Sequence, residues 1–169
     1  MRDRGKRLRS WSSRRSERPR LAGPFLFPVG ILWACMACGE PNPELLPDEV
    51  LQAELGLTLD DRVHTVTLTG GGAERVEPGV ATVAEGEFVQ FVSTDWFVHE
   101  VTFESDSLGN AALAFMERTD QLDSPPLIYK DSRFVVSFED APPGRYPFVV
   151  AGNGRPGRGV IVLAEAEAR

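Results

Sequence analysis

Cysteine and histidine are both rare in this sequence of 169 residues. Cys35 and Cys38 lie close together near the N-terminus, and His64 and His99 follow later in the chain. Zinc sites in proteins normally use three or four ligands, so a zinc site here would depend on Asp or Glu side chains. The sequence shows no recognisable serine–histidine nucleophile pair and no phosphate-binding loop. We therefore expect a protein that is not an enzyme.

Positive charge is concentrated at the start of the chain. Residues 1–20 contain nine Lys or Arg and two acidic residues, whereas residues 21–169 contain nine basic and 23 acidic residues. A surface with this excess of negative charge repels a phosphate backbone, so the composition argues against nucleic acid as a partner. The acidic part suits a cationic partner or simply keeps the protein soluble.

A long run without charge follows the basic start, from Leu21 to Cys38, with the sequence LAGPFLFPVGILWACMAC. A basic segment followed by an apolar run is typical of an export signal. The positive-inside rule then places residues 1–20 in the cytoplasm and everything after Cys38 on the other side of the membrane.

Three interpretations of the two cysteines remain open. The run resembles a bacterial lipobox, in which Cys35 or Cys38 would become the lipidated first residue. Alternatively, residues 21–38 form an uncleaved membrane anchor, or the cysteines form a redox motif. Covalent haem attachment does not fit, because no His follows Cys38. The first two interpretations both predict a membrane-anchored bacterial protein that faces the periplasm or the cell exterior.

Residues 39–59 are predicted to form a linker that contains one short helix. The helix is expected over residues 47–55, with Pro47 in its first turn and Gly56 at its end. Its apolar residues could lie against the domain that follows. These residues are Val50, Leu51, Ala53 and Leu55.

The remainder of the chain has the pattern of an all-β protein. Short segments of alternating or apolar residues, separated by Gly and Pro turns, are predicted as strands. These are residues 63–68, 76–83, 88–92, 99–104, 134–138, 146–150 and 159–163. The pattern predicts a Greek-key β-sandwich over residues 60–165, followed by a tail at residues 166–169. One long excursion, residues 105–133, interrupts the strands and contains a predicted helix at residues 110–118.

The stretch PGVATVAEGEFVQFVSTDWFVHEVTF resembles the cupredoxins, the group of plastocyanin and azurin. The later stretch PPGRYPFVVAGNGRPGRGVIVL resembles the closing segment of that family. The positions that match the first pattern are Pro78, Val83, Gly86, Val89, Phe91, Asp95, His99 and Phe103. The resemblance covers most of the part predicted to be exported, and it implies a cupredoxin-like fold.

Copper in that family is held by two imidazoles, one thiolate and a distant thioether. By resemblance His99 matches the first ligand, whereas Val150, Asn153 and Gly157 stand where the other three are expected. The resemblance therefore implies the fold without a blue-copper centre, and we expect no cofactor. A weak copper or zinc site at His99, completed by a carboxylate, stays open as an alternative.

Two groups of residues are candidates for binding a partner. Trp96 and Phe97 precede His99, and loops near the metal form the partner-facing surface of cupredoxins. Arg155 and Arg158 lie among glycines in the closing loop and carry positive charge on an acidic domain.

We expect a membrane-tethered, non-catalytic interaction or structural subunit that has lost copper. Its host could be a respiratory or photosynthetic electron-transfer complex, by analogy of fold alone. Two alternatives are a copper-binding electron-transfer protein with a nonstandard site around His99, and an envelope lipoprotein that binds a small ligand beneath the excursion 105–133.

Overall fold

The computed structural model describes residues 42–164. The predicted cytoplasmic segment 1–20, the apolar run 21–38 with Cys35 and Cys38, and the tail 166–169 lie outside the described residues. Within residues 42–164, no helix has the length and apolar character needed to cross a membrane.

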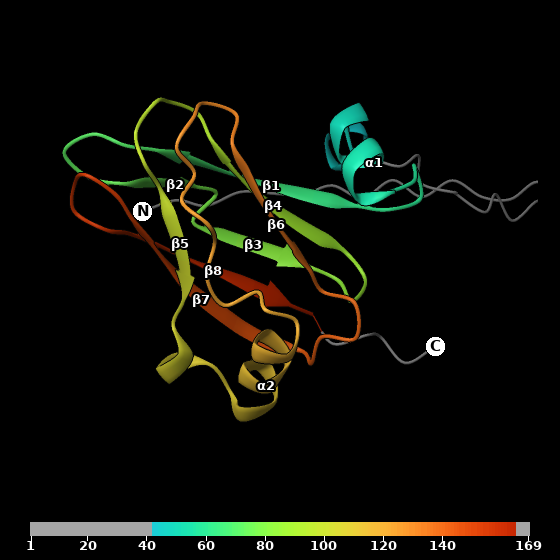
Figure 1. Cartoon of the computed structure of the whole chain (residues 1–169). Helices are drawn as coiled ribbons and strands as arrows, with labels where there is room; N and C mark the ends of the chain where they lie inside the picture. Colours follow the sequence, from blue (N-terminus) through green and yellow to red (C-terminus); the bar gives the residue numbers. More distant parts are fainter. Residues whose placement is uncertain (1–41, 165–169) are drawn as a thin grey trace, which may run out of the picture. The chain divides into compact units, whose positions relative to one another are not determined.

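Eight short strands form two four-stranded sheets that pack face to face (Figure 1). The first sheet has the order β2 (Arg75–Glu77), β1 (Val63–Thr69), β4 (Phe88–Ser93) and β6 (Arg133–Ser137). The second has the order β3 (Val80–Val83), β8 (Gly157–Leu163), β7 (Gly144–Ala151) and β5 (Glu100–Phe103). β1 pairs parallel with β4 and β3 pairs parallel with β8, and the other pairs are antiparallel. The predicted all-β sandwich is confirmed.

The single strand expected over residues 76–83 is two strands in the structure. β2 belongs to the first sheet and β3 to the second, and Pro78 and Gly79 lie between them. Proline cannot donate a hydrogen bond to a neighbouring strand, so this dipeptide is a suitable place for the chain to change sheets. The alternating residues correctly predict extended strands in this segment. They do not predict that the chain crosses from one sheet to the other at Pro78 and Gly79.

Helix α1 (Glu49–Leu55) begins two residues after Pro47, which was predicted to lie in its first turn. Asp48 is its N-cap, because its carboxylate accepts hydrogen bonds from Val50 N–H (3.1 Å) and Leu51 N–H (3.0 Å). The hydrogen bond from Leu51 holds the pKa of Asp48 below its ordinary value despite partial desolvation, and the Arg133 guanidinium at 2.6 Å adds to this. Gly56 ends the helix with φ +70°.

Of the four apolar residues expected to lie against the domain, Leu51 alone is buried. Leu51 is 2% exposed, but Val50 and Leu55 are 46% and 50% exposed. A short 3₁₀ helix, η1 (Pro43–Leu45), precedes α1 and contacts β1. This part of the chain is therefore attached to the sandwich through η1, Leu51 and the Asp48–Arg133 ion pair.

The excursion 105–133 forms part of the hydrophobic core. It contains the 3₁₀ helix η2 (Ser105–Ser107) and helix α2 (Asn110–Arg118), which has the predicted bounds. Five of its side chains join the core cluster: Leu108, Ala112, Phe115, Met116 and Leu127. Because these side chains are buried with those of the two sheets, the excursion is a structural layer of the domain.

Aromatic rings fill the space between the sheets. The fully buried ring of Phe91 on β4 lies 4.9 Å from Phe148 on β7 and 6.3 Å from Phe103 on β5, measured between ring centres. Both pairs meet edge to face, the arrangement that the ring quadrupoles favour. Tyr146 is also fully buried, and its hydroxyl donates a hydrogen bond to the Pro142 carbonyl at 2.5 Å.

We expect Tyr146→Phe to lower the free energy of unfolding by about 1 kcal/mol at neutral pH, because the hydrogen bond to Pro142 is lost inside the core. Burial raises the pKa of Tyr146 from 10.0 to about 12. The associated stability is fully present below pH 10 and is lost as the pH rises through about 12, because the unfolded state ionises first. Urea denaturation between neutral and alkaline pH should show a shallower alkaline decline in the variant.

Tyr129→Phe is the matched control, because Tyr129 is 60% exposed and the substitution removes the same hydroxyl. We expect its free energy of unfolding to stay close to that of the wild type. An equal loss in both variants at neutral pH would contradict the role assigned to the Tyr146 hydrogen bond.

Candidate functional site

His99 lies immediately before β5 and is held in place by its backbone. Its N–H donates to the Leu127 carbonyl (3.1 Å), and its carbonyl accepts from Leu127 N–H (2.8 Å). The His99 side chain is 0% exposed. The imidazole that the resemblance matches to the first copper ligand is therefore fully enclosed.

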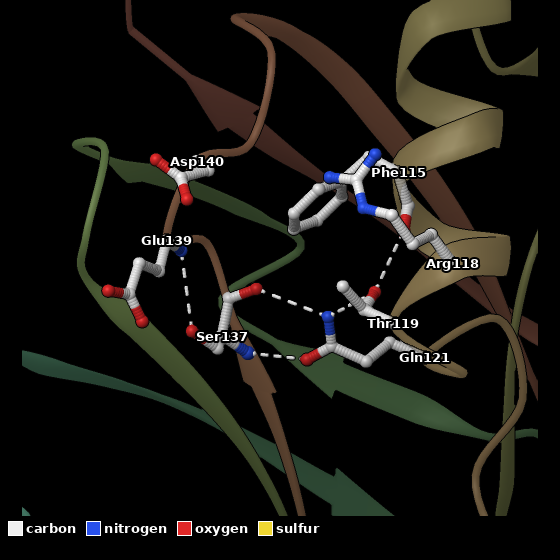
Figure 2. A pocket seen from close by; sticks show the side chains of 7 residues that line it. All are labelled: Phe115, Arg118, Thr119, Gln121, Ser137, Glu139 and Asp140. Carbon is white, nitrogen blue, oxygen red and sulfur yellow. Dashed lines mark hydrogen bonds between the residues drawn. The ribbon is translucent and has the colours of Figure 1, made fainter.

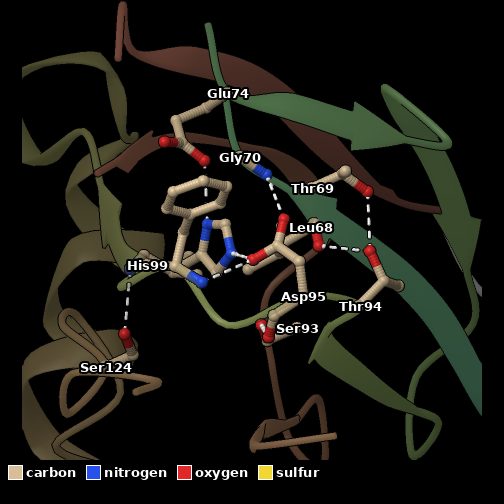
Figure 3. A network of polar contacts seen from close by, with 11 residues as sticks. Leu68, Thr69, Gly70, Glu74, Ser93, Thr94, Asp95, His99 and Ser124 are labelled. Carbon is tan, nitrogen blue, oxygen red and sulfur yellow. Dashed lines mark hydrogen bonds and ion pairs between the residues drawn. The ribbon is translucent and has the colours of Figure 1, made fainter. Parts of the chain in front are cut away.

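Both ring nitrogens of His99 face carboxylates (Figure 3). Nδ1 lies 2.8 Å from Glu74 Oε2, and Nε2 lies 3.0 Å from Asp95 Oδ1. An ionised carboxylate only accepts hydrogen bonds, so Nε2 donates to Asp95 when that carboxylate is ionised. We call these three side chains the buried triad.

Asp95 connects the triad to two loops. Its Oδ2 accepts a hydrogen bond from Gly70 N–H (2.6 Å), and its Oδ1 also accepts one from Phe97 N–H (2.8 Å). Burial raises the pKa of Asp95, but the bonds from Gly70, Phe97 and His99 outweigh it, and the pKa lies below its ordinary value. Asp95 is thus well suited to remain ionised at neutral pH.

Glu74 fills the space between His99 and the closing loop. Its side chain is 0% exposed, and its Oε1 is buried without a hydrogen-bond partner in the described part of the chain. A Cβ placed on Gly152 would lie 2.2 Å from this oxygen, and one on Gly157 would lie 3.1 Å from Glu74 Cβ. Only residues without side chains at 152 and 157 allow Glu74 to occupy this position without a shift of its neighbours.

The other positions that the resemblance assigns to copper ligands carry no suitable donor set. Val150 on β7 and Gly157 on β8 are buried and face each other in register. Asn153 is exposed in the turn between these strands. A blue-copper centre needs a thiolate and a second imidazole, and the residues present do not fit it.

The triad itself is arranged poorly for a metal ion. Glu74 and Asp95 approach opposite nitrogens of the same ring, so their oxygens do not converge with a ring nitrogen on one point. Within residues 42–164, no group of three or more His, Cys, Asp or Glu side chains is placed to hold a metal ion.

Both predicted aromatic candidates are on the surface. Trp96 is 73% exposed and Phe97 is 45% exposed. Tyr129, which the sequence analysis did not single out, lies close to Trp96, with ring centres 6.5 Å apart. We define the aromatic patch as the exposed apolar side chains of these two adjoining loops: Trp96, Phe97, Val98, Ile128 and Tyr129.

The two predicted arginines have different surroundings. Arg158 forms an ion pair with Glu104. Arg155 lies with Arg75 beside a hollow of about 430 Å³. We define the arginine hollow by its lining residues, which are Thr69, Gly70, Gly71, Gly72, Ala73, Arg75 and Arg155.

A second hollow lies where the excursion meets the sandwich (Figure 2). It measures about 420 Å³ and is lined by residues that include Phe115, Arg118 and Asp140. Gln121 bridges across it, because its amide accepts a hydrogen bond from Ser137 N–H (2.7 Å) and donates one to the Ser137 carbonyl (3.3 Å). This doubly bonded bridge fixes the excursion to β6 and leaves it little freedom to act as a lid.

No protein-family model matches the chain, and no curated protein sequence matches it. Among solved structures, a point mutant of amicyanin in the reduced Cu(I) form is 21% identical, with a TM-score of 0.43, and the match covers 62% of this chain and 84% of that one. A purple cupredoxin from Nitrosopumilus maritimus is 18% identical, with a TM-score of 0.42, and the match covers 60% and 99%. The two four-stranded sheets, with the parallel pairs β1–β4 and β3–β8, give the domain a cupredoxin-like fold.

Proposed function

We propose that this protein is a membrane-tethered, extracytoplasmic cupredoxin-like module that works without copper. It serves as a non-catalytic interaction or structural subunit of a larger assembly. The observation that carries the proposal is the contrast between an interior filled by the chain's own side chains and an exposed aromatic patch directly outside it.

The filled interior argues for the loss of copper. The Glu74 carboxylate lies against the His99 imidazole and under Gly152, in the region that the resemblance assigns to the metal. Val150 and Gly157 offer no donor atom there. A copper ion at His99 would have to displace Glu74 and would still lack the soft thiolate ligand of the family.

The aromatic patch supports a role in protein contact. Exposed Trp and Tyr side chains are enriched among the residues that dominate binding energy at interfaces. Trp96 and Tyr129 are 73% and 60% exposed, and Asp95 accepts a hydrogen bond from Phe97 N–H within the same loop. A rigid loop loses less conformational entropy on binding than a mobile one, so this surface is suited to docking.

The N-terminal sequence supports the proposed location, and the fold supports the proposed host complex. An export signal or anchor at residues 21–38 would hold the domain at the membrane on the periplasmic or exterior side. Cupredoxin-like domains suggest a respiratory or photosynthetic electron-transfer complex as the host, by analogy of fold.

Purified protein exposed to Cu(I) and Cu(II) and then dialysed should retain no stoichiometric copper and show no intense blue absorption. The physical reason is the missing thiolate together with the Glu74 carboxylate at the imidazole. Elemental analysis and visible spectroscopy of the wild type and of His99→Ala make the measurement.

Glu74→Gln is the companion variant, because it retains the shape of the side chain and removes its charge. Circular dichroism should first establish that both variants are folded. Stoichiometric copper in the wild type that disappears in folded His99→Ala would overturn the proposal and favour a nonstandard copper site around His99.

Bacteria that produce the full chain should carry it in the membrane fraction, because residues 21–38 are apolar and uncharged. Protease added to spheroplasts should digest the domain. In the lipoprotein interpretation, Cys38→Ser or Cys35→Ser abolishes lipidation, and mass spectrometry of the mature N-terminus identifies which of the two is used. In the anchor interpretation, neither substitution changes the membrane fraction. Protease-resistant full-length protein in the cytoplasm would refute the proposed location.

A further inference from the structure

The arginine hollow is built by the close approach of two loops. A Cβ on Gly154 would lie 2.6 Å from the Gly71 carbonyl oxygen and 2.9 Å from Ala73 N, so the two backbones pack directly on each other. Arg155 N–H donates to the Gly72 carbonyl (3.3 Å), and the Arg155 carbonyl accepts from Glu74 N–H (2.8 Å). These contacts fix the backbone of Arg155 beside the turn that leads into Arg75.

The charges at this hollow are unbalanced. Acidic residues outnumber basic ones more than two to one in residues 42–164, yet no carboxylate lines the hollow. Within the described part of the chain, Arg75 and Arg155 make no ion pair, whereas Arg62, Arg133 and Arg158 each lie within 4.0 Å of a carboxylate. Two exposed guanidinium groups without counter-charges form a suitable site for an anion.

Two acidic side chains close to the lining of the hollow make their hydrogen bonds elsewhere. Glu74 is directed at His99 Nδ1, and Asp95 Oδ2 is occupied by Gly70 N–H. Both belong to the buried triad. The guanidinium groups therefore remain available to a ligand from outside.

The hollow adjoins the aromatic patch. A Cβ on Gly70, which lines the hollow, would lie 3.0 Å from the Cβ and Cδ2 atoms of Phe97. A bound anionic group would thus lie beside exposed apolar side chains. A small inorganic anion would use only the hollow, whereas an acidic side chain on a protein surface could use both features.

This surface lies at the end of the sandwich away from the point where the chain enters it. Glu44 and Leu45 of η1 lie beside His64 and Thr65 near the start of β1, whereas Thr69 at the end of β1 borders the hollow. Seven residues of strand separate the two ends by about 20 Å.

We propose that the arginine hollow binds carboxylate side chains of a protein partner whose contacting surface is acidic and apolar. Arg75 and Arg155 receive the carboxylates, and the aromatic patch covers the neighbouring apolar side chains. This inference rests on the proposed function, because it names the chemistry of the partner that the module docks onto.

The first test uses a defined probe on the full chain in detergent micelles. The probe is an acetylated, amidated peptide with the sequence Leu-Glu-Leu-Glu-Leu, and the control peptide has Gln in place of Glu. Backbone amide NMR should show shifts at Gly70–Ala73 and Arg155 with the acidic peptide only. Arg75→Gln or Arg155→Gln should each weaken binding about threefold, and the double variant about tenfold, as expected for exposed ion pairs.

Arg145→Gln is the matched control, because Arg145 is also exposed and lies on β7 at the opposite end of the sandwich. Arg145→Gln removes one positive charge, as each of the other single variants does, and it should leave peptide binding unchanged. Equal weakening by Arg145→Gln, or equal binding of the Gln peptide, would overturn the inference. Shifts with sodium phosphate or with phosphatidylglycerol vesicles but none with the peptide would overturn it as well.

A second measurement separates this inference from the proposed function. A photo-reactive benzoylphenylalanine at position 129 of the full chain should form a discrete protein adduct in native membranes, attached at an Asp- or Glu-containing peptide. The adduct should decrease in the Arg75→Gln/Arg155→Gln variant and persist in Arg145→Gln. An adduct that persists in both variants would refute the acidic partner but not the proposed docking function. The absence of any protein adduct would refute both proposals.

Discussion

The buried contact of Glu74 and Asp95 with His99 determines the arrangement of the loops at one end of the sandwich. Glu74 precedes β2, Asp95 lies between β4 and β5, and His99 immediately precedes β5, so the triad ties both sheets together where their hydrogen-bonded ladders end. Removing one carboxylate would leave a ring nitrogen of the fully buried His99 without its hydrogen-bond partner, which costs about 1–3 kcal/mol. The loops that carry the aromatic patch are therefore anchored from inside the domain.

The glycines of the closing loop are required by that same contact. Side chains at 152 and 157 would meet Glu74, and one at 154 would meet the backbone of Gly71 and Ala73. The copper ligands expected at 153 and 157 by resemblance include a bulky thioether at 157, and its Cβ alone would lie 2.9 Å from the Glu74 carbonyl oxygen. The Glu74 arrangement and a full set of metal-ligand side chains thus compete for one space, and this chain has the residues for the former.

Much of the fold could be predicted from the sequence, because alternating residues and Gly or Pro turns report locally on strands. The crossover at Pro78–Gly79 could not, since it depends on which sheet receives each strand. The resemblance located His99, but Glu74 lies 25 positions away in a polar segment and has the appearance of a surface residue. Tyr129 and Arg75 were missed for the same reason, because they join Trp96 and Arg155 only through the folded topology.

A patch of five apolar side chains and two arginines is small for an independent protein interface, since stable complexes usually bury about 800 Å² on each partner. A tether changes this requirement, because it holds the domain near any partner in the same membrane and turns a second contact into an effectively intramolecular one. A weak surface on the domain is then sufficient for docking. The proposed tether and the proposed docking surface therefore support each other: the first supplies local concentration, and the second supplies orientation and selectivity.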